Sequence, residues 1–187
     1  MGMGQRETTE IQTWEEFKEI RAEVIIEKKE DAIRTAAEWS DHRGTVWTDG
    51  SRLERGSVGT AWAFKRGDKW VRRVTFLGSN KEVFDAEVYA VLQAVRLLND
   101  REERGQRYTI FSDSQAALDR AQHDRTGPAQ AFARAAIATV SDLVDRDNSI
   151  TLRWTPAYRG VEGMNRPMRW PREQQRRRRA EQSLHTS

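Results

Sequence analysis

The chain of 187 residues contains no cysteine, which excludes disulfide bonds, thiolate zinc sites and a cysteine nucleophile. Long apolar runs are also missing. No stretch approaches the roughly 18 residues of a membrane-spanning helix, and the N-terminus has no apolar signal segment. These absences predict an intracellular protein, nuclear or cytoplasmic, without a membrane partner.

The composition fits one domain with flanking extensions. Hydrophobic residues make up 37% of the chain and charged residues 33%, and charges of both signs alternate with apolar residues, which argues against wholesale disorder. The chain has 32 basic and 29 acidic residues, but seven Arg and two Glu lie in residues 164–187. Residues 1–163 therefore hold 25 basic and 27 acidic residues. The net basic charge belongs to the C-terminal tail, so function has to be inferred from motifs.

The order of predicted elements indicates an α/β fold. Residues 1–43 form a polar lead-in, helical or partly ordered, because apolar residues recur at helical spacing from Thr13 to Trp39. Three strand-like runs follow at 45–48, 58–65 and 70–77, with Gly67-Asp68 as a hairpin signal between the last two. Helices are predicted at 84–98, 114–122 and 128–144, and further strands at 108–112 and 150–154. The order βββαβααβ predicts a five-stranded mixed sheet flanked by helices.

Three acidic residues stand at the ends of these elements. Asp49 closes the first predicted strand, Glu87 lies in the first turns of the long helix, and Asp113 follows the fourth strand. If the first and fourth strands are neighbours, the three carboxylates converge, and their mutual repulsion calls for a cation such as Mg²⁺ or Mn²⁺. Simpler readings remain open for each residue alone: a turn at Asp49, a helix N-cap at Asp113 and a solvated surface residue at Glu87.

Four motifs in order carry a family resemblance. They are Thr-Val-Trp-Thr-Asp-Gly-Ser-Arg-Leu (45–53), Val-Phe-Asp-Ala-Glu-Val-Tyr-Ala (83–90), Ile-Phe-Ser-Asp-Ser-Gln-Ala-Ala (110–117) and Arg-Trp-Thr-Pro-Ala (153–157). Together they resemble the ribonuclease H domains of fungal non-LTR retrotransposon reverse transcriptase polyproteins, over a domain spanning residues 44–163. The resemblance implies a ribonuclease H-like sheet of strand order 3-2-1-4-5. It also implies that residues 1–43 are the remnant of a linker to an upstream reverse transcriptase domain.

The resemblance also implies an activity, the cleavage of the RNA strand of RNA–DNA hybrids. Asp49, Glu87 and Asp113 would hold two divalent ions, one generating the attacking hydroxide and the other stabilising the leaving 3′-oxygen. Contacts with RNA 2′-hydroxyls and the DNA backbone would select the hybrid. The candidates for these contacts are Gly50, Ser51, Ser114 and Gln115.

The chain departs from the family pattern near its C-terminus. Tyr158 stands where the family has a His that assists turnover, and Met168 where it has a fourth metal-binding Asp. A phenol with a pKa near 10 and a soft thioether cannot replace them. The genetic code largely fixes the codons of Met164-Asn165 and Trp170-Pro171. When these codons and those between them are read one base earlier, they permit the family's Gly-Asn-Glu-x-Ala-Asp. We therefore expect residues 164–187 to be a frameshift-derived, disordered, Arg-rich tail.

The altered tail predicts impaired catalysis and leaves two rival functions open. One rival is a catalytically dead remnant that still binds nucleic acid. The other is a different nuclease on the same type of sheet, such as a 3′–5′ exonuclease or an integrase. The Asp-Ala-Glu helix after a three-stranded meander argues against the second rival.

Overall fold

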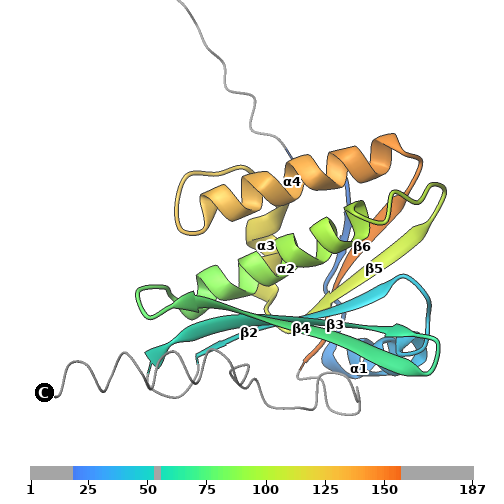
Figure 1. Cartoon of the computed structure of the whole chain (residues 1–187), viewed down its shortest axis with the longest axis horizontal. Helices are drawn as coiled ribbons and strands as arrows, with labels where there is room; N and C mark the ends of the chain where they lie inside the picture. The colour runs from blue at the N-terminus through green and yellow to red at the C-terminus, as the bar shows by residue number, and fades with distance from the viewer. Residues whose placement is uncertain (1–18, 53–55, 157–187) are drawn as a thin grey trace, which may run out of the picture.

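One twisted six-stranded sheet carries helices on both faces in the computed structural model, which describes residues 19–52 and 56–156 (Figure 1). Helices α2, α3 and α4 lie over one face, and α1 lies over the other (Figure 1). In chain order the elements are β1 (Glu23–Ile25), α1 (Lys29–Trp39), β2 (Thr45–Arg52), β3 (Val58–Arg66), β4 (Lys69–Gly78), α2 (Val83–Asn99), β5 (Arg107–Ser112), α3 (Gln115–Gln122), α4 (Gln130–Asp145) and β6 (Ser149–Trp154).

The sheet order is β1-β6-β5-β2-β3-β4. Strands β2, β3 and β4 form an antiparallel meander, whereas β2 pairs with β5, β5 with β6, and β6 with β1 in parallel. A two-residue loop joins β3 to β4, and Gly67 takes the positive φ of 57° that its first position requires. Counted from β2 onwards, the order is 3-2-1-4-5. The predicted α/β class and strand order are therefore confirmed.

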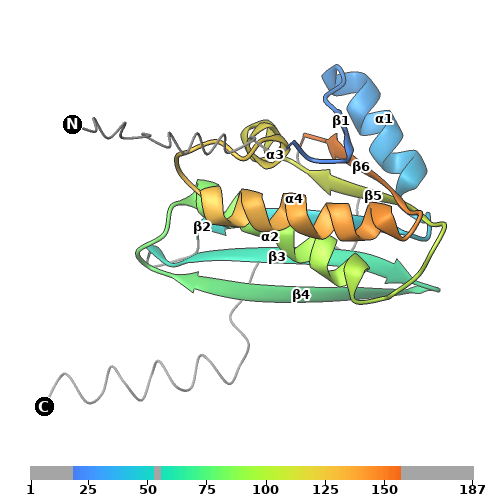
Figure 2. The same cartoon turned by 90° about the horizontal axis from the view of Figure 1, so that it is seen from above.

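The predicted strand number of five is wrong, because a sixth strand, β1, adds to the edge beyond β6. Figure 2 shows β1 and α1 at this side of the sheet, opposite β4. Val24 pairs with Leu152, and the backbone nitrogen of Ile20 donates a hydrogen bond of 2.8 Å to the carbonyl oxygen of Gln122. The β1–β6 pairing satisfies backbone groups of β6 that an uncovered strand would leave unpaired. The helix expected from Thr13 is shorter, since among the described residues it covers only Lys29–Trp39.

Helix α2 forms the centre of the main core. Its apolar stripe, which includes Val91, Leu92, Val95 and Leu98, is fully buried against β2, β3 and α4. Burying a side chain of this kind contributes about 1.5–3 kcal/mol, so α2 is held mainly by packing. This packing fixes the position of α2 against the sheet. Among residues 19–52 and 56–156, no helix has the length and the apolar character needed to span a membrane.

A second, smaller core lies on the face that α1 covers. The rings of Trp47 and Phe111 stack there at 4.3 Å, with Ala36 and Trp39 of α1 packed against them. Trp62 is buried in the main core, and Trp154 is half-buried beside it. These four tryptophans therefore serve packing, and strands β2 and β5 are buried on both faces just before the positions of Asp49 and Asp113.

Candidate active site

Asp49 and Glu87 are brought together by a direct contact between β2 and α2 at Gly50. A Cβ atom at position 50 would lie 2.5 Å from the backbone nitrogen of Glu87 and 2.8 Å from the carbonyl carbon of Ala86. Real Cβ atoms essentially never approach backbone so closely, so only glycine lets the helix sit this near the strand. Asp49 is paired within β2, opposite Ala61 of β3. The alternative of a turn at Asp49 is therefore wrong.

Asp113 lies at the junction between β5 and α3. The cap of α3 is Ser114, whose hydroxyl oxygen accepts a hydrogen bond of 3.1 Å from the backbone nitrogen of Ala117. The indole nitrogen of Trp154 donates to the carbonyl oxygen of Asp113 at 3.1 Å and anchors the junction to β6. Because Ser114 caps the helix, the alternative of Asp113 as the N-cap is wrong. The Asp113 carboxyl group remains available for another role.

The three carboxylates interact through their charges. Although Asp113 as a residue is exposed, its carboxyl group is partly withdrawn from water; this burial, followed by the charges of Asp49 and Glu87, raises its pKa to about 6. Burial also raises the pKa of Asp49, with Arg72 acting to lower it and Glu87 to raise it. Sequence elements from β2, α2 and the β5–α3 junction therefore meet in one region of concentrated negative charge.

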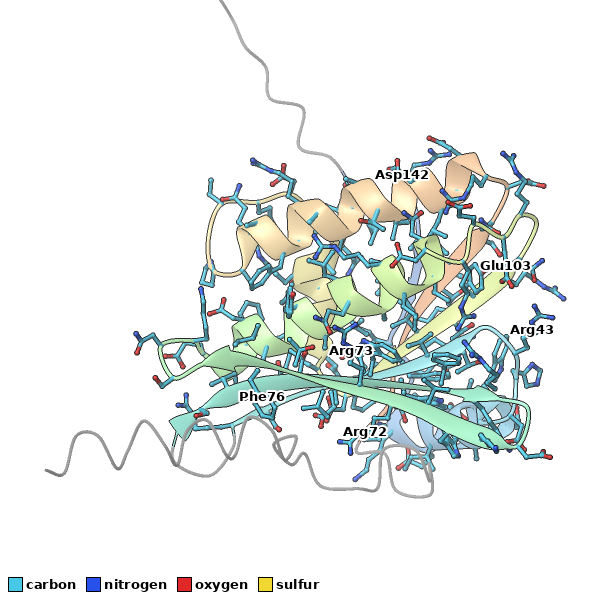
Figure 3. All side chains as sticks on the ribbon, in the orientation of Figure 1. Arg43, Arg72, Arg73, Phe76, Glu103 and Asp142 are labelled. Carbon is cyan, nitrogen blue, oxygen red and sulfur yellow. The ribbon has the colours of Figure 1, made fainter. Side chains whose placement is uncertain are left out.

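The site contains one cation that the motifs did not indicate, Arg72 of β4. Arg72 pairs with Ala63 of β3, and Ala63 pairs with Trp47 of β2, two residues before Asp49. Its charge partly offsets that of Asp49 across the small side chains of β3. In Figure 3 the Arg72 side chain lies on the opposite side of the sheet from α2 and α4. In the sequence, Arg72 alternates with Trp70, Val74 and Phe76 along a predicted strand, so it is the one charged residue on an otherwise apolar side. Identifying Asp49 as its partner required the pairing register of the strands.

Glu87 is half-buried and tied to the helix cap. The Ser114 hydroxyl donates a hydrogen bond of 2.5 Å to the Glu87 carboxylate and at the same time accepts from Ala117. The alternative of a solvated surface glutamate is therefore wrong. This bond also orients Glu87 toward α3, which links α2 to the β5–α3 junction.

The three carboxylates have the chemistry that a hard divalent cation prefers, but their side chains do not surround a metal position in this structure. Burial and the neighbouring carboxylates raise the pKa values of Asp49 and Asp113, so a bound cation would stabilise their ionised forms, and carboxylate oxygens are the ligands that Mg²⁺ and Mn²⁺ prefer. However, within residues 19–52 and 56–156 no three His, Cys, Asp or Glu side chains are arranged so that they could hold a metal ion. The hydrogen bond from Ser114 occupies one oxygen of the Glu87 carboxylate, so the other oxygen would be the one that binds an ion.

The candidate nucleic-acid contacts differ in what their side chains already do. Gly50 is used for packing, and Ser114 for the helix cap and Glu87. Ser51 is half-buried on β2 opposite Gly59, and Gln115 is exposed at the first position of α3. Gln115 makes no side-chain hydrogen bond with the described part of the chain, so of the four it is the most accessible. Tyr158, Met168 and the tail from residue 164 lie outside the described residues.

Proteins similar to this chain are found among the solved structures. No family model matches the sequence, and no curated protein matches it. Among solved structures, the chain is similar to an RNase H1 from the halophilic archaeon Halobacterium salinarum NRC-1, with 18% sequence identity and a TM-score of 0.45. The similar region covers 65% of this chain and 90% of the archaeal one.

Proposed function

We propose that this chain is a divalent-metal-dependent endonuclease of the ribonuclease H type, derived from a retrotransposon, that acts on the RNA strand of RNA–DNA hybrids. Support comes from the strand order 3-2-1-4-5 with a parallel β2–β5 pair at its centre. Four ordered sequence motifs support the same activity, and their described residues fall on β2, on α2, on β5 with the start of α3, and on the end of β6.

The observation that carries the proposal is the electrostatic interaction of Asp49, Glu87 and Asp113. Burial and the charges of Asp49 and Glu87 raise the pKa of Asp113 to about 6, whereas an Asp in a structural ion pair has its pKa lowered by the neighbouring cation. Two carboxyl groups with raised pKa values beside a third carboxylate are characteristic of catalytic and metal-binding sites.

The protein residues would bind and orient. Asp49 and Asp113 would supply oxygen ligands from the adjacent parallel strands, and Glu87 would complete the set from α2. Divalent ions bound there would supply activation of a water molecule and stabilisation of the leaving 3′-oxygen. Ser114 would orient Glu87 through its hydrogen bond of 2.5 Å. Ser51 and Gln115 would contact the sugar-phosphate backbone beside the carboxylates.

We further propose that catalysis is impaired in this copy. Tyr158 and Met168 replace two residues that the resemblance places in the site. The second candidate function, a nucleic-acid-binding remnant without catalysis, is favoured by one observation: the described residues contain no closed metal-binding group. The two candidates differ in whether hybrid cleavage requires a divalent ion and the three carboxylates.

Metal binding can be measured by calorimetric titration of the full chain with Mn²⁺. We expect the parent to bind, and Asp49→Asn and Asp113→Asn to bind much more weakly. Asp142→Asn is the matched control, because it removes one negative charge from an exposed position on α4 (Figure 3). If both site variants bind Mn²⁺ as the parent does, the assignment of the site is wrong.

Activity can be measured with end-labelled RNA–DNA hybrid, double-stranded RNA and double-stranded DNA. We expect slow cleavage of the hybrid only, and faster cleavage after Tyr158→His is combined with the restored Gly-Asn-Glu-x-Ala-Asp segment. Each 1.36 kcal/mol of recovered transition-state stabilisation corresponds to about tenfold in rate. Mn²⁺ should support the parent better than Mg²⁺, which demands stricter octahedral geometry. Binding of hybrid without any cleavage, even after repair, would favour the inactive remnant.

A further inference from the structure

A cleft of about 630 Å³ opens at the end of the sheet away from the three carboxylates. It lies between the β3–β4 turn, the segment that follows α2 and the residues that precede β2. Figure 3 shows Arg43 and Glu103 at this end of the sheet. The charged residues of the lining are four cations and two carboxylates: Arg43, Lys65, Arg66, Arg101, Asp41 and Glu103. The lining therefore has an excess of two positive charges.

Both carboxylates of the cleft already have ion-pair or hydrogen-bond partners. Arg43 donates a hydrogen bond of 3.0 Å to one oxygen of Glu103, and the Tyr108 hydroxyl donates one of 2.7 Å to the other. Lys65 forms an ion pair with Asp41. Glu103 forms its ion pair with Arg43 and acts on Arg101 only through its charge. The excess positive charge is therefore located on Arg66 and Arg101.

The guanidinium groups of Arg66 and Arg101 both lie over the aromatic ring of Phe64. Their guanidinium carbons lie 5.6 and 4.6 Å from the ring centroid of Phe64. Across residues 19–52 and 56–156, neither side chain makes a hydrogen bond or an ion pair. Arg101 is also half-buried, and burial lowers its pKa, while Glu103 and Tyr108 act to raise it. A half-buried guanidinium without a hydrogen-bonded anion is costly to maintain, which makes the pair receptive to a ligand.

We propose that this cleft binds a phosphate group, with Arg66 and Arg101 donating hydrogen bonds to its oxygens. Guanidinium groups present planar pairs of donors that match phosphate oxygens. The stacking of both groups on Phe64 orients their donors before the ligand arrives. A terminal phosphate carries a charge of about −1.5 to −2 at pH 7, which balances the excess of the lining. The source would be either a free phosphate or the phosphates of a polynucleotide.

The site is independent of the proposed nuclease site. Gly44 lines the cleft immediately before β2 begins, whereas Asp49 lies five residues further along the chain, toward the other end of that strand. A strand advances about 3.3 Å per residue, so the two sites are separated by roughly 15 Å or more. Loss of phosphate binding in the cleft therefore leaves the carboxylates unchanged, and loss of the carboxylates leaves the cleft unchanged.

The test uses the full chain in the presence of EDTA, so that no cleavage occurs. Inorganic phosphate is titrated by calorimetry, and labelled oligonucleotides of one sequence, with a 5′-phosphate or a 5′-hydroxyl, are titrated by fluorescence anisotropy. Arg66→Met and Arg101→Met remove the charge while an apolar stem remains to cover Phe64. Arg34→Met is the control, because it removes one positive charge from an exposed position on α1. Circular dichroism melts verify that each variant is folded.

We expect each single variant to weaken inorganic phosphate binding about tenfold and the double variant to abolish it. Arg34→Met should bind as the parent does, and Arg101→Lys should show an intermediate loss because it keeps the charge without the planar pair of donors. A preference for the 5′-phosphorylated oligonucleotide that disappears with Arg101→Met assigns the cleft to strand ends. Equal, Arg101-dependent binding of both oligonucleotides assigns it to internal phosphates. The proposal is overturned if the double variant binds every phosphate probe as the parent does, or if polyglutamate binds through Arg101 more tightly than any of them.

Discussion

Asp113→Asn should stabilise the protein in the absence of divalent ions. The folded state raises the pKa of this carboxyl group from 3.8 to about 6, so it favours the protonated form. The stabilising contribution of that form is fully present below the unfolded pKa of 3.8 and is lost as the pH rises through about 6. At pH 8 the folded parent therefore keeps an ionised carboxylate beside Asp49 and Glu87, and asparagine removes this repulsion.

The magnitude follows from the size of the pKa change. Each pH unit corresponds to about 1.4 kcal/mol, so a site closed to water would give roughly 3 kcal/mol. Asp113 is exposed, and solvent screening reduces the expected gain to about 1 kcal/mol. Near pH 4 the carboxyl group of the folded parent is protonated, and the gain should shrink toward zero.

The assay is urea unfolding followed by tryptophan fluorescence in EDTA, at about pH 8 and about pH 4. The control is Asp142→Asn, which should change the free energy of unfolding by less than about 0.5 kcal/mol at either pH. Adding Mg²⁺ at pH 8 should stabilise the parent more than Asp113→Asn, because only the parent keeps the full ligand set. If Asp113→Asn is no more stable than Asp142→Asn at pH 8, or if its gain is the same at both pH values, the three carboxylates do not interact as described.

Three further predictions concern the framework around the two sites. Gly50→Ala should lower the free energy of unfolding by about 1–3 kcal/mol in urea denaturation, because its Cβ would overlap the backbone of Ala86 and Glu87; an unchanged midpoint would contradict the close contact. Ser114→Ala should cost about 1 kcal/mol through loss of the α3 cap, whereas Ser114→Thr should retain most of that stability, and equal losses in both would contradict the capping role. Burial and the Glu103 carboxylate raise the pKa of Tyr108 to about 12. In an ultraviolet absorbance titration, the folded protein should therefore show one tyrosine that ionises near pH 12, and Tyr108→Phe should remove this step. Ionisation of Tyr108 near pH 10 would contradict its hydrogen bond to Glu103.

Most elements could be predicted from the sequence because their apolar periodicity was unambiguous. The stripe from Val88 to Leu98 identified α2, and the strand runs on either side of Gly67-Asp68 identified β3 and β4 to within two residues. Strand β1 could not be predicted, since three residues are too few for a period and their pairing depends on the free edge of β6. The sequence predicts that α4 starts at Pro128, whereas it starts at Gln130, because Ala129 adopts a left-handed φ of 55°.

The candidate site could be predicted in outline but not in its internal contacts. Strand ends and a helix start indicated Asp49, Glu87 and Asp113. The Asp-Gly-Ser string, however, does not distinguish a glycine needed for substrate approach from one needed for helix packing, and Gly50 is used for packing. Neither the bond between Ser114 and Glu87 nor the influence of Arg72 on Asp49 follows from spacing, because each depends on how separate elements meet.

The seam between β1 and β6 has a practical consequence for work with this protein. A polypeptide started at residue 44, the first residue of the predicted domain, would lack β1 and leave the backbone of β6 from Thr151 to Arg153 without a neighbour on that side. Such a strand is a template for intermolecular pairing, and truncated preparations should therefore aggregate. It would also lose the Arg153–Glu27 and Arg21–Asp145 ion pairs, which tie the first described residues to β6 and α4. Recombinant versions that begin upstream of Glu19 should stay monodisperse under the same conditions.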